Sequence, residues 1–367
     1  PRTRVVVCCG AGGVGKTTTA AALVLRAAER GRRAVVITVD PALRLAQSLG
    51  LESLDNSPRP VELSADVPGE LHAMMLDMKR TFDEVVEEHA DPERARQILA
   101  NPFYETLSTN FSGTQEYMAM EKLGQLRQSE EWDLIVVDTP PSRSALDFLD
   151  APKRLGRFLD GKLITFLSAP ASTGAFRLLG AGFNLVSSII GKIVGTQFLA
   201  DLRSFVSAFD TVFGGFQERA ERTYRLLQAP GTEFVVVATP EADALREASY
   251  FMQRLSSESM APAGLVVNRA HLPPEGPAGR LSAKAATAAA KTLEESGDHP
   301  WAVAALRLHA ERMEARDREL LLRDRLLAAH RNVRVAEVPA LPEDVHDLAG
   351  LRDVGAALAE AGRHGRA

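Results

Sequence analysis

The sequence predicts an α/β fold, namely a doubly wound, mostly parallel sheet with an inserted helical subdomain. Short apolar runs rich in valine recur along the chain and are typical of strands buried on both faces. Helical patterns lie between most of these runs, and this alternation favours parallel strands joined by right-handed crossovers. The expected strands are residues 4–9, 34–39, 71–76, 133–137, 233–238, 264–267 and 333–338. Ligands of such a sheet bind at the carboxyl ends of the strands.

The composition is that of an ordinary globular protein of 367 residues, 45% of them hydrophobic and 25% charged. The net charge of −5 gives no support to nucleic-acid binding. Cys8 and Cys9 are neighbours in a predicted strand and point to opposite faces, so we expect no disulfide between them. We expect a cytoplasmic location, because nothing indicates an oxidising compartment and the first residues lead directly into that strand without a signal peptide.

Two stretches interrupt the alternation of strands and helices. Residues 78–131 are charged and helical in pattern, whereas residues 151–228 are richer in glycine and apolar side chains. The longest uncharged pieces of the second stretch have about fourteen residues, fewer than the ~20 that cross a bilayer, so we do not expect an integral membrane protein. We expect both stretches to form a helical lobe inserted into one domain that spans residues 1–367. The second stretch then either packs on the core as an ordinary subdomain or forms a hydrophobic groove or dimer face.

The C-terminal third differs in composition from the rest of the chain. Residues 271–300 are rich in proline, glycine and alanine, and we expect them to begin as a mobile loop. Residues 301–330 predict one long charged helix.

A glycine-rich stretch follows the first predicted strand and precedes a helix-forming run. It reads GAGGVGKTT and fits the P-loop pattern G-x-x-x-x-G-K-[ST], so the chain is predicted to be a P-loop NTPase. Glycines let backbone N–H groups approach phosphate oxygens, and the following helix adds the positive end of its dipole. Lys16 should reach the β- and γ-phosphates of ATP, and the hydroxyl of Thr17 should bind Mg²⁺. The expected nucleotide-binding residues here are Gly10, Ala11, Gly12, Gly13, Val14, Gly15, Lys16, Thr17 and Thr18.

Two acids follow predicted strands and should face this loop. Asp40 ends the strand at 34–39 and is the candidate that orients the attacking water, so Asp40 and Lys16 are the expected catalytic residues. An Asp-Pro pair by itself is also a common way to end a strand. Asp138 ends the strand at 133–137 in the Walker B arrangement and should support the Mg²⁺ ion held by Thr17. The loop after Asp138 should respond to whether ATP or ADP is bound.

Together these motifs resemble the ArsA-type ATPases, a family that includes the arsenite-pump ATPase and the eukaryotic factor that delivers tail-anchored membrane proteins. The family's deviant Walker A pattern aligns with residues 11–18, its switch I pattern with residues 40–45 and its switch II pattern with residues 138–141. The matching motifs occur in the same order along nearly the whole chain, and the sequence as a whole is most similar to those of actinobacterial members. The resemblance implies a Mg²⁺-dependent, dimeric ATPase whose nucleotide state rearranges its helical lobes.

The resemblance also implies an adenine site. The segment Val266-Val267-Asn268 is similar to the family's V-V-N element, which would place Asn268 against the base. Residues 338–345 are similar to the family segment that closes over adenine, which adds Pro339 and Leu341 to the expected binding residues.

One departure from the family concerns Ala11. The family's defining second lysine, which reaches the partner's phosphates across a dimer, would stand at this position. Three interpretations stay open: a paralogous chain supplies the lysine in a heterodimer, Arg44 or Arg143 replaces it, or hydrolysis is slow. In switch I, Leu43 and Gln47 replace the histidine and aspartate usual in the targeting factor.

Other departures restrict the function. Nothing besides Cys8 and Cys9 could supply thiolates, which disfavours arsenite export, a zinc staple and an iron–sulfur bridge. The preferred hypothesis is an ATPase that handles a protein client with a hydrophobic segment, and that lies peripheral to the membrane through its client. One alternative is a weakly hydrolysing or non-hydrolysing, ATP-sensing module that acts with a paralogous partner. Another is a partitioning ATPase on DNA or membrane, for which residues 356–367 are only weakly basic.

Overall fold

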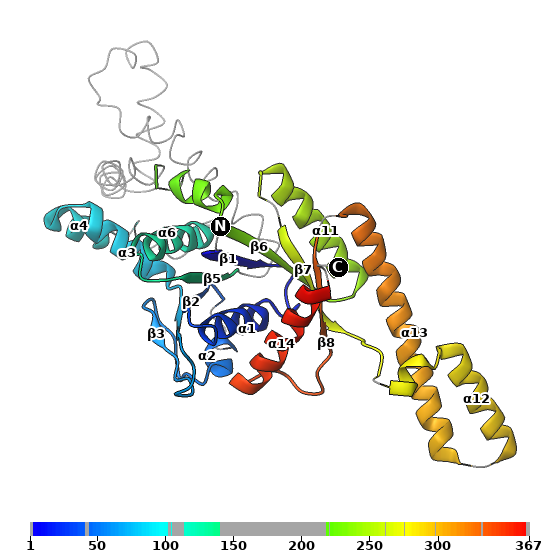
Figure 1. Ribbon diagram of the computed structural model, residues 1–367. Coiled ribbons are helices and arrows are strands. Elements are labelled where there is room, and N and C mark those ends of the chain that lie inside the picture. Colours follow the sequence, from blue (N-terminus) through cyan, green and yellow to red (C-terminus); the bar gives the residue numbers. More distant parts are fainter. Residues whose placement is uncertain are drawn as a thin grey trace, which may run out of the picture.

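An eight-stranded sheet forms the centre of the protein (Figure 1). The computed structural model describes residues 3–40, 44–101, 104, 114–139, 218–219, 221–260, 262–274, 276–297, 299–331 and 333–364. The strand order is β3-β4-β2-β5-β1-β6-β7-β8, and all neighbours are parallel except β3 and β4. The strands are β1 (Val5–Cys9), β2 (Arg33–Thr38), β3 (Arg59–Pro60), β4 (Glu70–Met75), β5 (Leu134–Asp138), β6 (Thr232–Ala238), β7 (Pro262–Ala270) and β8 (Val335–Pro339).

The predicted α/β class and all seven predicted strands are confirmed. The short edge strand β3 was not predicted, because its two residues, Arg59 and Pro60, are too few to form a pattern. Proline suits this place, since an edge strand does not need every backbone N–H for the ladder.

Helices cover both faces of the sheet. They are α1 (Lys16–Ala28), α2 (Arg44–Ser48), α3 (Met78–His89), α4 (Pro92–Leu99), α6 (Thr114–Gln128), α11 (Ala242–Ser257), the 3₁₀ turn η2 (Gly276–Arg280), α12 (Ala283–Ser296), α13 (Pro300–Ala329) and α14 (Leu348–His364). Helices α1 and α14 pack side by side on one face, and α6 and α11 lie on the other (Figure 1). None of the described helices is long and apolar enough to cross a membrane.

The helical prediction for residues 78–131 is confirmed where the structure describes them, by α3, α4 and α6. Of residues 151–228, only 218–219 and 221–228 lie among the described residues, and they are mainly helical. The long helix expected at 301–330 is α13. Helix α12 was not predicted, although its signals are present: the side chain of Ser282 accepts a hydrogen bond from the Ala285 N–H, and Gly297 ends the helix in the left-handed conformation.

Helix α1 is anchored by small and medium apolar residues. Ala20, Ala21, Val24 and Leu25 are all buried, and the alanines let the helix lie close to the valine-rich strands. Because β1 and α1 are both fixed in the core, the loop between them has rigid ends.

Helices α12 and α13 form a hairpin that extends from the sheet (Figure 1). Besides apolar packing that includes the buried Leu326, two polar contacts bind α13 to the body. Glu319 accepts hydrogen bonds from the backbone N–H of His271 at 2.9 Å and lies 2.6 Å from the Nδ1 atom of its ring. Arg323 forms an ion pair with Glu337 of β8.

We predict that Leu25→Ala lowers the free energy of unfolding by about 2–5 kcal/mol, since it removes a side chain that is 1% exposed and leaves a cavity beneath the sheet. Leu321→Ala is the matched control, because Leu321 on α13 is 54% exposed and its truncation should cost no more than about 0.5 kcal/mol. Urea unfolding measures both, and equal losses would contradict the packing described for α1.

Candidate active site

The loop between β1 and α1 requires glycine at two positions for steric reasons. A Cβ atom on Gly10 would lie 2.0 Å from the carbonyl oxygen of Val237 in β6. A Cβ atom on Gly15 would lie 2.1 Å from the Nδ2 atom of Asn268, and Gly15 has a φ of 96° at the N-cap of α1. The backbone therefore passes closely between β6 and β7, and it brings the N-terminus of α1 to the carboxyl edge of the sheet.

Lys16 is the first residue of α1 and is only 7% exposed. Its ammonium group donates a hydrogen bond to the carbonyl oxygen of Ala11 at 2.8 Å, so the side chain folds back over the loop. Burial lowers the pKa of Lys16, while the nearby carboxylate of Asp138 acts in the opposite direction. A buried cation over a glycine-rich loop is suited to bind an anion that replaces this internal hydrogen bond.

Asp138 at the end of β5 connects three strands. It pairs in register with Cys8 of β1 on one side and with Thr38 of β2 on the other. Its Oδ2 atom accepts hydrogen bonds from the hydroxyl groups of Thr17 at 2.8 Å and Thr38 at 2.9 Å. Its Oδ1 atom is buried and accepts no hydrogen bond from any described residue. A fully buried carboxylate with an unused oxygen is ready for a further donor or cation.

The electrostatic environment of Asp138 reflects this burial. Burial raises its pKa from 3.8 to about 6, although the hydrogen bonds from Thr17 and Thr38 and the charge of Lys16 lower it. Burial also raises the pKa of the Cys8 and Cys9 thiols beneath the loop. These thiols remain protonated and make poor metal ligands.

Asp40 follows β2 and lies on the same edge of the sheet. Its backbone N–H donates a hydrogen bond to the Thr38 hydroxyl at 3.2 Å, so Thr38 connects Asp40 to Asp138. Thr139 is held in a similar way on the other side, because its hydroxyl donates to the carbonyl oxygen of Cys8 at 2.8 Å.

These groups surround a cavity of about 660 Å³. It is lined by Gly13, Gly15, Lys16, Thr17, Thr18, Asp40, Arg44, Gln47, Ser48, Thr139, Arg269, Asp344, Val345 and His346. The ring of His346 hydrogen-bonds to the Asp344 carbonyl, which raises its pKa together with the nearby carboxylate of Asp347. Because several cations converge on it, the cavity favours a polyanion.

The donor atoms also suit Mg²⁺. The Thr17 hydroxyl and the Asp138 carboxylate are oxygen donors of the kind that Mg²⁺ prefers. Within the described part of the chain, no group of three or more histidine, cysteine or acidic side chains could hold a metal alone. A Mg²⁺ ion at this site would therefore depend on phosphate oxygens and water for its other ligands, as is usual for nucleotide sites.

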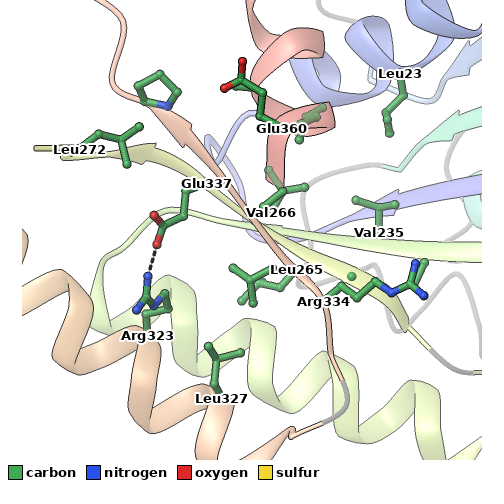
Figure 2. Close-up of a pocket in the computed structure, with 17 residues that line it drawn as sticks. Leu23, Val235, Leu265, Val266, Leu272, Arg323, Leu327, Arg334, Glu337 and Glu360 are labelled. Atoms are coloured by element: carbon green, nitrogen blue, oxygen red, sulfur yellow. Dashed lines mark hydrogen bonds and ion pairs between the residues drawn. The ribbon is translucent and has the colours of Figure 1, made fainter. Parts of the chain in front are cut away.

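A larger hollow of about 810 Å³ lies elsewhere, around the edge strand β8 (Figure 2). Its lining is mainly apolar and includes Leu23, Val235, Leu265 and Leu327, and the ion pair between Arg323 and Glu337 lies at its side. It contains neither the glycine loop nor the acids at the carboxyl ends of β2 and β5. Size alone would therefore indicate the wrong place for phosphate chemistry.

The comparison with known proteins agrees with this geometry. The profile of the ArsA ATPase family, described as anion-transporting ATPase, matches residues 3–314. The chain belongs to this family. It is 26% identical to ATPase GET3 of Malassezia globosa over 276 residues, which cover 74% of both chains. It is 29% identical to ATPase GET3B of Arabidopsis thaliana over 289 residues, which cover 72% of this chain and 63% of the relative. ATPase get3 of Schizosaccharomyces pombe is 27% identical over 267 residues, covering 72% and 73%.

The predicted resemblance is therefore confirmed for the ArsA family as a whole, and so is the predicted class of enzyme, an ATPase. The structure brings most predicted site residues of this ArsA-family chain together. Gly13, Gly15, Lys16, Thr17, Thr18 and Asp40 line the cavity, and Asp138 lies directly behind Thr17. Gly10, Ala11, Gly12 and Val14 complete the loop. That these residues bind ATP and Mg²⁺ stays a prediction.

The three residues predicted to contact adenine lie in different surroundings. Asn268 donates a hydrogen bond from Nδ2 to the carbonyl oxygen of Val14 at 2.8 Å, so it supports the phosphate loop. Pro339 lines the hollow at β8, and Leu341 packs against the core. Their contact with adenine stays a prediction. Arg44 lines the cavity as expected for a replacement cation, whereas Arg143 lies outside the described residues.

Sequence reasoning missed Arg269 and the group at Asp344–His346 as cavity residues. Arg269 directly follows the V-V-N element, and residues 344–346 overlap the C-terminal end of the segment 338–345 that resembles the adenine-closing segment. Their proximity to known motifs was the only available signal.

We predict that Asp138→Asn stabilises the metal-free protein above pH 6. The raised pKa means that the folded state binds a proton more tightly than the unfolded state, so ionised Asp138 costs stability as the pH rises from about 4 through about 6. The gain from the substitution should reach about 3 kcal/mol at pH 7.5 and vanish near pH 4, measured by urea unfolding with a chelator. Asp317→Asn, which removes an exposed carboxylate on α13, is the control and should change little. A destabilised Asp138→Asn protein at pH 7.5 would contradict this assignment.

Proposed function

We propose that this chain binds and hydrolyses ATP with Mg²⁺ at the cavity of residues 13–18. The observation that carries the proposal is the hydrogen bonding of Thr17 and Thr38 to one buried oxygen of Asp138, directly behind the cavity that Lys16 lines. This arrangement joins the predicted metal residues to the predicted phosphate residues, and it leaves the second oxygen of Asp138 without a hydrogen bond from any described residue.

Each residue then has a defined task. Lys16 exchanges its hydrogen bond with Ala11 for the β- and γ-phosphates, which the loop amides also bind. Thr17 and Asp138 would hold Mg²⁺, and the ion would supply positive charge that offsets the negative charge of the transferred phosphate. Asp40 orients the attacking water from the neighbouring strand end, where Thr38 fixes its backbone.

The nucleotide state would act on the rest of the molecule through the loop that begins at Thr139. The hydrogen bond from Thr139 to Cys8 anchors the start of that loop beside the cavity. We propose that ATP and ADP favour different positions of this loop, and that a dimer and the helical lobe at 78–131 and 151–228 rearrange in response. The relatives that match 74% and 72% of the chain are named as ATPases, which supports a nucleotide cycle in this chain.

The composition of residues 151–228 indicates the kind of cargo that the cycle would handle. A protein client with a hydrophobic segment fits the apolar, glycine-rich composition of residues 151–228. We propose a cytoplasmic ATPase that meets the membrane through this client, and a place for the chain among actinobacterial members of the family on the texture of its sequence.

Ala11 favours a second candidate function. Without a charged side chain at this position, two copies of the chain cannot supply each other with a lysine finger. The chain could then act as a slowly hydrolysing ATP sensor beside a paralogous partner that carries the lysine. A cation supplied across such an interface is worth about 10³–10⁵ in rate in other phosphoryl-transfer enzymes.

We predict that Lys16→Ala abolishes ATP turnover and weakens ATP binding at least about tenfold, because a buried cation over the phosphate loop is lost. Steady-state phosphate release and calorimetric titration of ATP measure the two effects. Lys284→Ala on the exposed face of α12 is the control and should match the parent. Undiminished turnover by the Lys16→Ala protein would refute the proposed site.

We predict that Ala11→Lys raises the turnover of the chain on its own by at least about tenfold, with a rate per chain that increases with protein concentration, because the lysine acts across a dimer. Phosphate release measured over a range of protein concentrations tests this. If the parent already turns over at the rate of the variant, another cation such as Arg44 fills the role and the sensor hypothesis is wrong.

A further inference from the structure

Arg269 has an unusual backbone conformation. Its φ of 61° lies in the left-handed region, which costs energy for any residue with a Cβ atom. The register between β7 and β8 is interrupted at the same place, since Asn268 pairs with Val338 and Ala270 pairs with Pro339. Arg269 is thus the extra residue of a bulge, and bulges re-aim side chains, often beside functional sites.

Both neighbours of Arg269 are fixed by hydrogen bonds. On one side, Asn268 binds the Val14 carbonyl of the phosphate loop at 2.8 Å. On the other side, the carbonyl oxygen of Ala270 accepts a hydrogen bond from Ala340 at 3.0 Å. The strained residue is therefore held between the phosphate loop and the segment after β8.

Arg269 lines the same cavity as Lys16, and its strand lies on the other side of β1 from β2 and β5. Asp40 and Thr139 extend from β2 and β5, whereas Arg269 extends from β7, beyond β1 and β6 in the sheet order. No other described residue forms a hydrogen bond or ion pair with its guanidinium group. A permanent cation held in a strained position, with no partner among the described residues, is suited to a ligand's negative charge.

We propose that Arg269 is a nucleotide-binding residue that contacts the phosphate nearest the nucleoside, the α-phosphate. This inference rests on the proposed function and adds a residue to the same site. The order of the strands supports the choice of phosphate, because the γ-phosphate must lie beside Asp40 and Thr139, and the triphosphate then extends along the loop toward β7. This contact would give the bound nucleotide a positive charge from the same chain, in which alanine stands at position 11 in place of the family's lysine.

The test compares Arg269→Gln with the parent protein in competition titrations of ATP, ADP and AMP against a fluorescent ATP analogue, with Mg²⁺ at fixed ionic strength. Because all three ligands carry the α-phosphate, we expect each to bind about tenfold more weakly, with kcat at saturating ATP changed less than about twofold. Arg280→Gln, an exposed arginine on η2 outside the cavity, is the matched control and should leave the three affinities unchanged.

A second variant separates charge from backbone strain. Arg269→Gly removes both, so its metal-free form should melt at a higher temperature than the parent and should still bind the three nucleotides as weakly as Arg269→Gln. Arg269→Lys keeps the charge and should recover part of the affinity.

Unchanged affinities in Arg269→Gln, or a loss confined to ATP or to kcat, would overturn the inference. The proposed function would still stand after such a result if the parent protein binds ATP and the Lys16→Ala variant binds it at least about tenfold more weakly. If the parent itself binds none of the three nucleotides, the proposed function and the inference fail together.

Discussion

The carboxylate of Asp138 and the two threonine hydroxyls that share its Oδ2 atom form the interaction on which the site depends. Thr17 belongs to the phosphate loop, Thr38 precedes Asp40, and Asp138 ends the central strand β5, so one oxygen atom sets the spacing of three otherwise separate segments. Burial of this charged carboxylate lowers the stability of the folded state. It also leaves one carboxylate oxygen available at the place where we propose that a divalent cation binds. A neutral residue here would make a more stable protein without the carboxylate that we propose as a Mg²⁺ ligand.

The sheet order makes this convergence unavoidable. Strands β2, β5 and β1 are adjacent, and their parallel register places Thr38, Asp138 and Cys8 in one row. Whatever follows these strands must meet at their carboxyl ends. The close passage of Gly10 beneath Val237 and of Gly15 beside Asn268 then extends the same edge to β6 and β7. The cavity of this ArsA-family chain is thus lined by segments that follow β1, β2, β5 and β8, together with Arg269 of β7.

Much of this could be predicted because the relevant signals are local. The glycine loop, Asp40 and Asp138 each sit directly after a buried strand, and a parallel sheet brings such residues together. Arg269 could not be predicted, because its position depends on how β7 pairs with β8, whose residues come more than sixty positions later. The contact of Asn268 with the phosphate loop could not be predicted for a related reason: only the folded loop shows that its amide meets the Val14 carbonyl. Helix α12 was missed because its many alanines and the prolines before it resembled a linker.

The central claim is that a nucleoside triphosphate lies along residues 13–18 with its terminal phosphate between Lys16 and Asp40. A crystal structure of the chain with Mg²⁺ and a non-hydrolysable ATP analogue tests it most directly. The account predicts density for the triphosphate in the cavity, with the Lys16 ammonium moved from the Ala11 carbonyl to the phosphates and Mg²⁺ beside Thr17. An analogue bound only in the hollow at β8, or a cavity that stays closed by the hydrogen bond between Lys16 and Ala11 at saturating analogue, would contradict it.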